Sequence, residues 1–243
     1  MTLKEALQNG NNIKEMAMAG MIDGGKFVHV YGRAPAVVAA TVSVWPIGTA
    51  AVYTNPASAS VLTIVSSSAN DAAAGTGART IIIKGLDANY LEIEETVTLN
   101  GTTNVLTIAS FLRVHSMEVI TVGSGGVPAG NITAVITATT YAIIPIGYTY
   151  SYNCNYTVPA GKTAYVVGGS ITSSAATILT ANFLATPQNK ALRNLHTMSI
   201  YQQPYQHEFY VPLPIPEKTD IDVRALGTAT STVVNITYDL IVA

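Results

Sequence analysis

The sequence has few charged residues, and long parts of it have none. Only 11% of its residues are Asp, Glu, Lys or Arg, and the formal net charge is −2. No Asp, Glu, Lys, Arg or His occurs in Ala34–Asn70, Val119–Gly161 or Thr163–Asn189. A free monomer normally carries charge over its whole surface. These stretches therefore predict surfaces that lie against other protein. They also give no electrostatic basis for binding nucleic acid, which calls for a basic stripe.

Cysteine, a signal peptide and long apolar runs are scarce or missing as well. The single cysteine, Cys154, has no partner for an intrachain disulfide, so cysteine gives no support for secretion. The first ten residues lack the cationic start and apolar core of a signal peptide, and we expect synthesis in the cytosol. The mean hydropathy is +0.34. Proline and glycine nevertheless interrupt every apolar run before the ~20 residues that a spanning helix needs. We therefore expect a soluble chain with no membrane partner.

The sequence contains none of the common motifs for catalysis or for metal and cofactor binding. A Gly-x-Ser-x-Gly elbow, a phosphate loop and a zinc-protease helix are all missing. His29, His115, His196 and His207 are scattered, and we interpret His207-Glu208 as an ordinary surface or interface pair rather than a metal site. Charged residues are too few to favour two paired catalytic acids. The prediction is a protein that is not an enzyme and that holds no metal or cofactor.

Thr, Ser, Ala, Val and Gly dominate the composition, and the β-branched residues among them favour strands. No stretch offers the crossover helices that a parallel sheet requires. We predict an all-β chain of antiparallel β-sandwich or jelly-roll units, one over residues 36–140 and one over residues 141–243. Pro212, Pro214 and Pro216 alternate, which restricts that segment to a sheet edge or an extended strap.

The segment Arg79–Leu99 shows the strand pattern most clearly. We predict a strand over 79–84 and a second over 91–99, in which Leu91, Ile93, Val97 and Leu99 share one face. Glu95 falls on this apolar face, so it needs a partner or a strand-edge position, and Arg79 or Lys84 could supply the partner charge. Asn100-Gly101 predicts a tight turn into a third strand of the same antiparallel meander.

The first 35 residues differ from the rest and form a predicted N-terminal arm. Two capping patterns, at Thr2–Glu5 and Asn12–Glu15, predict short helical pieces. One interpretation is a helix packed on its own domain. The other is an arm that reaches a neighbouring subunit, because methionine-rich faces adapt to irregular surfaces. The residues expected to make that contact are Leu7, Ile13, Met16 and Met21.

Aromatic residues are only 7% of the sequence, but tyrosines cluster in one place. On a strand, Tyr148, Tyr150, Tyr152 and Tyr156 would point to one side. We favour a self-interface or a half-buried ladder, because tyrosine packs well while its hydroxyl reaches water. The alternative is a platform on which a sugar or a partner stacks.

Several segments resemble virion proteins of tailed bacteriophages. They are Ala69–Thr80, Gly85–Tyr90, Glu94–Thr102, Tyr156–Tyr165 and Val211–Ala225. Together they extend over roughly residues 69–243, and the N-terminal part matches less clearly. The proteins that the sequence resembles are head decoration (cement) proteins or tail-associated components. The resemblance implies a structural role and supplies no catalytic residues.

From this resemblance we expect a capsid decoration protein, made in the host cytoplasm and located on the capsid surface of the virion. We expect it to be a homotrimer that binds the phage major capsid protein and stabilises the shell, with Leu7, Ile13, Met16 and Met21 of the arm making the capsid contact. The alternative is a tail- or fibre-associated virion protein with a carbohydrate- or receptor-binding role.

Overall fold

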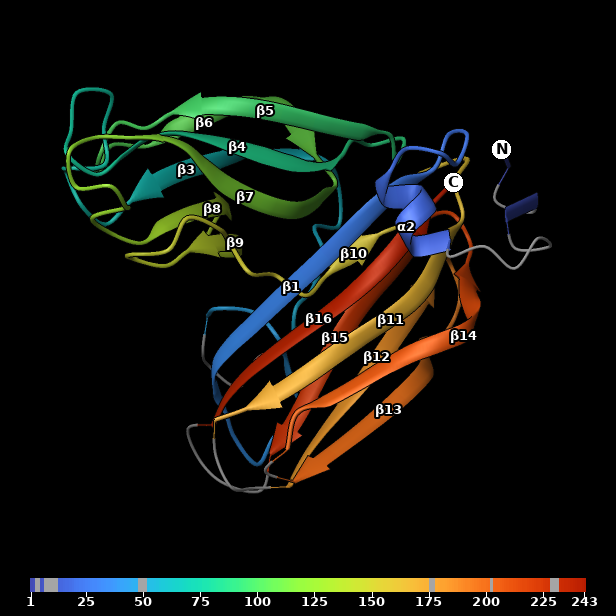
Figure 1. Cartoon of the computed structure of the whole chain (residues 1–243). Helices are drawn as coiled ribbons and strands as arrows, with labels where there is room; N and C mark the ends of the chain where they lie inside the picture. The colour runs from blue at the N-terminus through green and yellow to red at the C-terminus, as the bar shows by residue number, and fades with distance from the viewer. Residues whose placement is uncertain (3–4, 7–12, 48–51, 175–177, 202, 228–231) are drawn as a thin grey trace. The chain divides into compact units, whose positions relative to one another are not determined.

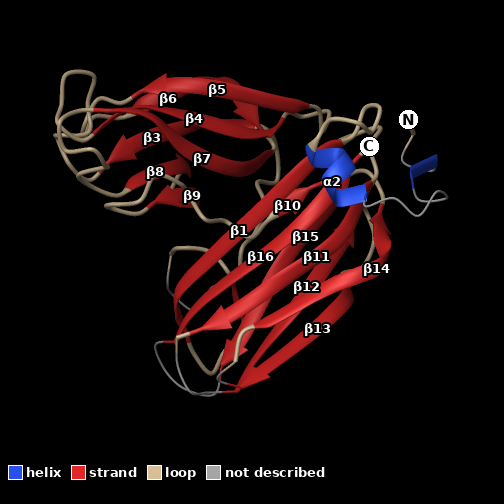
Figure 2. Ribbon diagram, in the orientation of Figure 1, coloured by secondary structure: helices blue, strands red, loops and turns tan. Residues whose placement is uncertain are grey.

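A computed structural model gives the fold of the chain (Figures 1 and 2). It describes residues 1–2, 5–6, 13–47, 52–174, 178–201, 203–227 and 232–243. Two compact units are present. The terminal unit contains Met1–Val44 and Cys154–Ala243, and the insert unit contains Trp45–Asn153. Strands make up nearly all of the regular structure in both units, and their pairing is antiparallel, which confirms the predicted all-β class.

The division into units differs from the predicted one at 36–140 and 141–243. β1 (Lys26–Val37) pairs with β16 (Thr232–Val242), from Lys26 opposite Val242 to Val37 opposite Thr232. Residues from both ends of the chain therefore lie in one sheet, and the insert unit interrupts the terminal unit. The predicted arm of residues 1–35 is wrong from Lys26 onward, because these residues form a sheet strand.

The terminal unit is a sandwich of two sheets. One sheet has the order β1-β16-β11-β14, and the other has the order β10-β15-β12-β13 with β2 beside β15. The further strands are β2 (Val42–Ser43), β10 (Tyr156–Thr157), β11 (Ala164–Ser173), β12 (Ile178–Pro187), β13 (Arg193–Tyr201), β14 (Tyr205–Ile215) and β15 (Thr219–Gly227). One apolar core between the sheets includes Val166, Phe183 and Tyr238. β14 ends its sheet and contains Pro212 and Pro214, so the edge position predicted from the prolines is confirmed.

The insert unit also has two sheets around one core. Their orders are β6-β3-β8-β9 and β5-β4-β7. The strands are β3 (Ser60–Ser66), β4 (Ala78–Leu86), β5 (Glu92–Thr98), β6 (Val105–Phe111), β7 (Arg113–Val122), β8 (Ile132–Ile136) and β9 (Thr139–Ile144). Leu62, Ile83 and Phe111 are fully buried between the sheets.

The predicted meander is correct for β4 and β5 and wrong for the next strand. β4 and β5 pair from Thr80 opposite Thr98 to Leu86 opposite Glu92. β6, however, pairs with β3 in the other sheet. The turn at Asn100-Gly101 therefore carries the chain from one sheet to the other. Of the predicted apolar face of β5, Ile93, Val97 and Leu99 contact the core, whereas Leu91 is exposed.

Asp71 anchors the loops of the insert unit. Its carboxylate is fully buried and accepts hydrogen bonds from the Ser66 hydroxyl at 2.6 Å and from the backbone N–H of Ala78 at 2.8 Å. It also accepts from the N–H groups of Ala129 at 2.8 Å and Gly130 at 2.9 Å. One charged group thus joins the loop before β4 to the loop before β8.

Candidate functional site

The helix of the predicted arm packs on its own unit. In α2 (Ile13–Met18), Ala17 is buried beside Val167 and Ile241, and Ile13 and Met16 pack against this cluster. Met21, just after the helix, is exposed. Leu7 lies outside the described residues. The structure therefore shows the first of the two interpretations for α2, and of the described residues predicted to make the contact (Ile13, Met16 and Met21) only Met21 is exposed.

Charged groups also hold α2 on the sheet. The Lys14 ammonium group forms an ion pair with the carboxylate of Asp239 on β16. His29 on β1 contacts the same carboxylate, with Nδ1 2.6 Å from Oδ1. The carboxylate is largely buried, so both contacts compensate its desolvation.

The tyrosines predicted to form one face do not lie on one strand. Tyr148 and Tyr150 each contact Tyr152 edge-to-face, with ring centroids 5.5 Å and 5.6 Å apart. Tyr152 has a φ of 45°, a conformation that an aromatic residue rarely adopts and that breaks strand alternation. Tyr156 is buried in the core of the terminal unit, on β10. The predicted common face is therefore wrong.

The first three of these tyrosines lie in a segment that covers the free edge of β7. The backbone N–H of Val119 donates to Thr149 O at 2.9 Å, and that of Ser151 donates to Met117 O at 3.0 Å. Burial raises the pKa of the Tyr150 hydroxyl, and a hydrogen bond with Ser116 partly offsets this. The segment thus packs within its own unit, and its rings do not form a flat stacking platform.

The most distinctive surface is the outer face of the sheet β6-β3-β8-β9. None of these four strands carries a charged residue. Burial alternates along them, and the side chains that point away from the core form what we call the neutral face: Val61, Thr63, Val65, Leu106, Ile108, Ser110, Thr133, Val135, Thr140 and Ile143. Ile108 is 93% exposed and Leu106 61% exposed.

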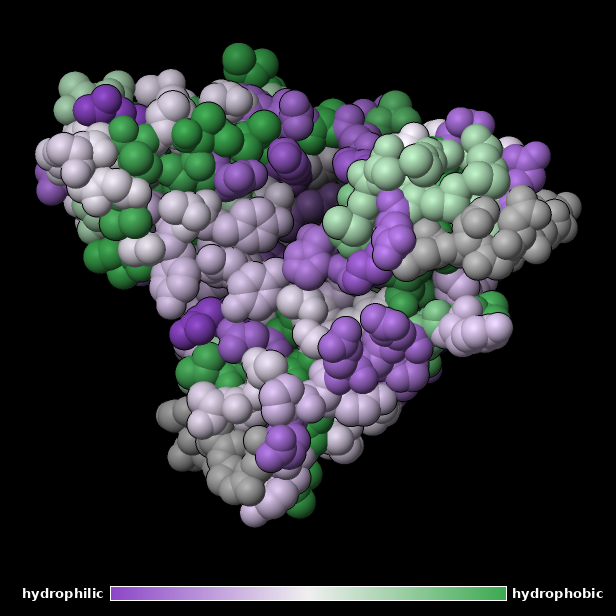
Figure 3. Space-filling view, in the orientation of Figure 1, coloured by the Kyte–Doolittle hydropathy of each residue, from purple (hydrophilic) through white to green (hydrophobic). Residues whose placement is uncertain are grey.

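The opposite sheet of the same unit shows the usual polar exterior. On β5-β4-β7, Lys84, Glu94 and Glu118 point outward, with Lys84 opposite Glu94. In the view of Figure 3, hydrophobic and hydrophilic residues are intermixed on the surface of this unit. Two of the uncharged stretches of the sequence supply β3, β8 and β9. The lack of charge along the chain thus becomes a lack of charge on one sheet.

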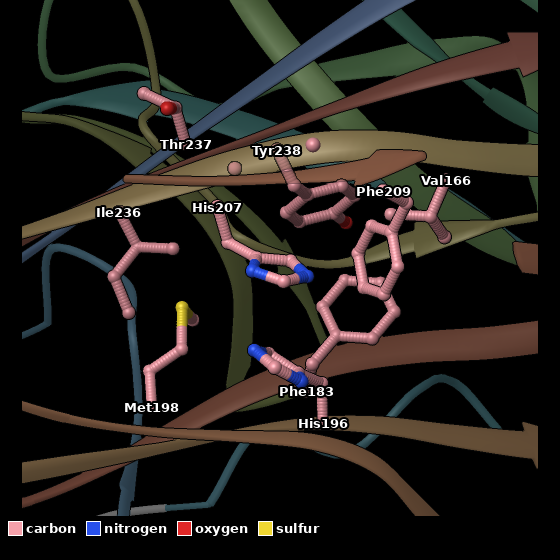
Figure 4. Close-up of a pocket in the computed structure, with 11 residues that line it drawn as sticks. Val166, Phe183, His196, Met198, His207, Phe209, Ile236, Thr237 and Tyr238 are labelled. Carbon is pink, nitrogen blue, oxygen red and sulfur yellow. The ribbon is translucent and has the colours of Figure 1, made fainter. Parts of the chain in front are cut away.

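A second unusual site lies at one edge of the terminal unit, between β13 and β14. These strands end their two sheets, and we call this side of the sandwich the open edge. The rings of His196 on β13 and His207 on β14 stack there, with centroids 4.6 Å apart and planes 25° apart (Figure 4). We call them the histidine pair. A cavity of about 20 Å³ beside them is lined by Phe183, Met198 and Phe209, among others.

The two histidines have different surroundings. The Nε2 atom of His196 is buried and makes no hydrogen bond with any residue that the structure describes. Loss of solvent, followed by the proximity of His207, lowers the pKa of His196. His207 lies with Nδ1 3.3 Å from the Tyr205 hydroxyl, and its ring meets Phe209 edge-to-face at 4.5 Å. A positive charge on His196 is therefore unfavourable where its ring lies.

The arrangement of the pair does not suit a metal ion. The lone pairs of an imidazole lie in the ring plane, so two nearly parallel stacked rings do not direct them to one point. In the described parts of the chain, no group of three or more His, Cys, Asp or Glu side chains is placed to hold a metal. No described helix has the length and apolar character needed to cross a membrane.

The sequence predicted neither the neutral face nor the histidine pair. The pair joins residues on two strands of different sheets, and only the alternation of His196 with Met198 and of His207 with Phe209 gives a local signal. No protein-family model matches the sequence, and no curated protein matches it.

Proposed function

We propose that the chain is a structural protein of a tailed-bacteriophage virion, which decorates the capsid and stabilises it by binding the major capsid protein. The proposal joins the sequence resemblance to one structural observation, the neutral face of the insert unit. Exposed, contiguous apolar surface without charge is typical of interaction sites. The occupant to which we commit is the outer surface of the assembled shell.

The physical basis of stabilisation is burial of this face. Ile108 and Leu106 stand furthest out of the sheet, so they are the expected centre of the contact. Burial of apolar area contributes about 25 cal/mol per Å² before the cost of association. A standard interface buries roughly 800 Å² per partner. Repetition at many symmetry-related positions of a shell multiplies a modest contact energy.

Substitutions that place charge on the neutral face test this proposal. Ile108→Glu and Leu106→Glu change residues that are already exposed, so folding is expected to persist. Each should weaken binding to undecorated capsids of the same phage at least about tenfold, because a charge would be desolvated without a partner. Co-sedimentation with capsids measures binding, and circular dichroism checks the fold.

The matched control is Thr98→Glu, on the outer side of β5 in the opposite sheet. It adds the same charge to the same unit, away from the neutral face. We expect it to bind capsids like the unmodified chain. Equal binding by Ile108→Glu and Thr98→Glu would refute the neutral face as the contact.

The copy number in purified virions separates decoration from the tail- or fibre-associated alternative. Quantitative mass spectrometry should find hundreds of copies per particle. A dozen copies or fewer would indicate a tail position and overturn the decoration role. Tyr148 is the most exposed member of the tyrosine segment, so a glycan array with a Tyr148→Ala control tests the carbohydrate-binding role.

We further propose that the protein is a homotrimer, with the outer side of the open edge as the self-contact. Tyr210 and Val211 on β14 and Tyr201 on β13 are among the most exposed apolar residues. Pro212 and Pro214 remove backbone donors from β14, so the contact relies on side chains. Native mass spectrometry should show three copies, and Tyr210→Ala should shift the equilibrium toward single chains. A strictly monomeric protein at micromolar concentration would contradict this.

A further inference from the structure

The histidine pair closes the open edge in an unusual way. His196 belongs to one sheet and His207 to the other, so their ring stack spans the gap between the sheets where the sandwich ends. Figure 4 shows the two rings facing each other beside Phe183, Phe209 and Met198. In the described parts of these strands, no backbone hydrogen bond joins β13 to β14. The two strands therefore meet through side chains, and the stacked rings are one of these contacts.

We propose that the histidine pair is a proton-sensitive latch at the open edge. It holds β13 against β14 while His196 is neutral, and it lets the two strands separate when His196 is protonated. The inference depends on the fold of the terminal unit alone and not on the virion role. Two neutral imidazoles stack favourably. Protonation of both would place two positive charges in ring contact, on the border of an apolar cavity.

Charged side chains lie near His207, in a second pocket that it also lines. This polar pocket of about 150 Å³, on its other side, is lined by Glu208, Asp239 and Lys14, among others. Asp239 already contacts Lys14 and His29, so Glu208 is the acid that remains available. From β14, Tyr205 offers its hydroxyl to the pair. From β16, Tyr238 donates its own hydroxyl elsewhere, to Cys154 O.

Among the described residues that line the cavity beside His196, none is acidic. The Nε2 of His196 is buried and without a described partner, and the elements packed around it contribute Phe183, Met198 and Phe209. The closed state, in which β13 and β14 are held together, therefore binds a proton on His196 more weakly than the open state, in which the strands have separated and the ring is in water. By linkage, a falling pH favours the open state. Opening exposes the apolar lining of the cavity at the end of the sandwich.

Hydrogen exchange of the intact protein tests the latch. Protection factors, corrected for the intrinsic pH dependence of exchange, are compared at about pH 7.5 and about pH 5. We expect protection in β13 and in the Tyr205–Phe209 part of β14 to fall about tenfold for each unit by which the pKa of His196 is lowered. Protection between β4 and β5 of the insert unit, which contain no histidine, should not change. Native mass spectrometry at both pH values separates edge opening from subunit dissociation.

Two variants identify the group responsible. His196→Gln cannot be protonated and should abolish the acid-dependent loss of protection, whereas His115→Gln, in the insert unit, should retain it. If β13 and β14 of the unmodified protein have the same exchange protection at acid pH as at about pH 7.5, the proposal is overturned. The same loss in His196→Gln would also overturn it.

His196→Gln can also loosen the edge at every pH through lost stacking, and a second measurement covers that case. The NMR titration of His196 in the unmodified protein should give a pKa below the ordinary 6.5. A pKa at or above that value would overturn the latch, whatever the variant does.

Discussion

The carboxylate of Glu95 on β5 accepts a hydrogen bond from the backbone N–H of Ile108 on β6, at 2.9 Å. It accepts a second from the N–H of Ala109, at 2.8 Å. β5 and β6 belong to different sheets, and the pairing of β6 with β3 shifts register around these residues. Glu95 thus pairs N–H groups that the sheet leaves unpaired, and it ties the two sheets together.

Replacement of Glu95 should therefore destabilise the insert unit. Glu95→Ala removes charge-assisted hydrogen bonds and leaves two donors unpaired, which costs about 2 kcal/mol. Glu95→Gln keeps one acceptor oxygen and should cost roughly half as much. The single tryptophan, Trp45, is buried in this unit, so its fluorescence in a urea titration reports the unfolding.

The control for this prediction is Glu94→Ala. Glu94 points outward from the same strand and is exposed, so its loss should change stability by less than about 0.5 kcal/mol. Equal effects at positions 94 and 95 would show that the bridge between the sheets contributes nothing.

Removal of the Asp71 carboxylate should have a larger effect. Asp71→Ala leaves two buried and one part-buried backbone N–H group and a serine hydroxyl without their acceptor, at a cost of about 3 kcal/mol or more. Asp87→Ala serves for comparison. Asp87 caps an exposed turn through the N–H groups of Asn89 and Leu91, so its loss should cost about 1 kcal/mol. The ranking, read from Trp45 fluorescence, is the result to check. A cost at Asp71 no greater than that at Asp87 would contradict the anchoring role.

These cases show what local sequence reveals. The alternation along β5 predicted that Glu95 lies on an apolar face and needs a partner. It did not predict the partner, because the backbone of a β6 bulge has no signature in side-chain pattern. The proposed Arg79 and Lys84 are therefore wrong, whereas the alternative of a strand-edge position is confirmed, because β5 ends its sheet. The all-β class and the pairing of β4 with β5 followed from local pattern alone.

Long-range pairing explains the remaining errors. The sequence predicts that β1 is divided between an arm and the start of a first unit, because nothing in Lys26–Val37 indicates that its partner is the last strand. Similarly, lack of charge predicted an interaction surface, but not that β3, β8 and β9 would lie side by side. The prediction of a common tyrosine face on one strand is wrong for a local reason, because the positive φ of Tyr152 turns the chain.

The thiol of Cys154 should be unreactive in the folded protein. Burial, and next the negative charge of Asp222, raises the pKa of the Cys154 thiol well above 9.0, and the side chain is almost fully buried. At about pH 8 a thiol reagent should modify it at least tenfold more slowly than in urea. Mass spectrometry of alkylated protein measures both rates. A Cβ at Gly32 would lie 2.4 Å from the Cys154 Cβ, so Gly32→Ala should displace this contact and accelerate modification. Equal rates in the folded and unfolded chain would contradict the burial.

Asp222 should make the stability of the terminal unit depend on pH. Burial raises the pKa of Asp222 above 3.8, although Arg224, with Nε 2.7 Å from Oδ2, and the Ser43 hydroxyl at 2.9 Å lower it in part. The folded state thus binds the proton more tightly than the unfolded state. The stabilisation that comes from protonation of Asp222 is complete below the pKa of this group in the unfolded chain. It is lost as the pH rises through the raised pKa of Asp222 in the folded protein.

Asp222→Asn removes this titration while keeping an oxygen that accepts from Ser43. The unfolding free energy of Asp222→Asn, relative to that of the unmodified chain, should therefore increase from about pH 3.5 to about pH 6.5. Urea titrations measure this difference, with hydrogen-exchange protection in β15 as the reporter of unfolding. Arg224→Gln removes a group that lowers the pKa, so it should extend the pH-dependent range upward. A difference that stays constant with pH would show that the carboxyl group has the same proton affinity in both states, and burial would then not control its charge.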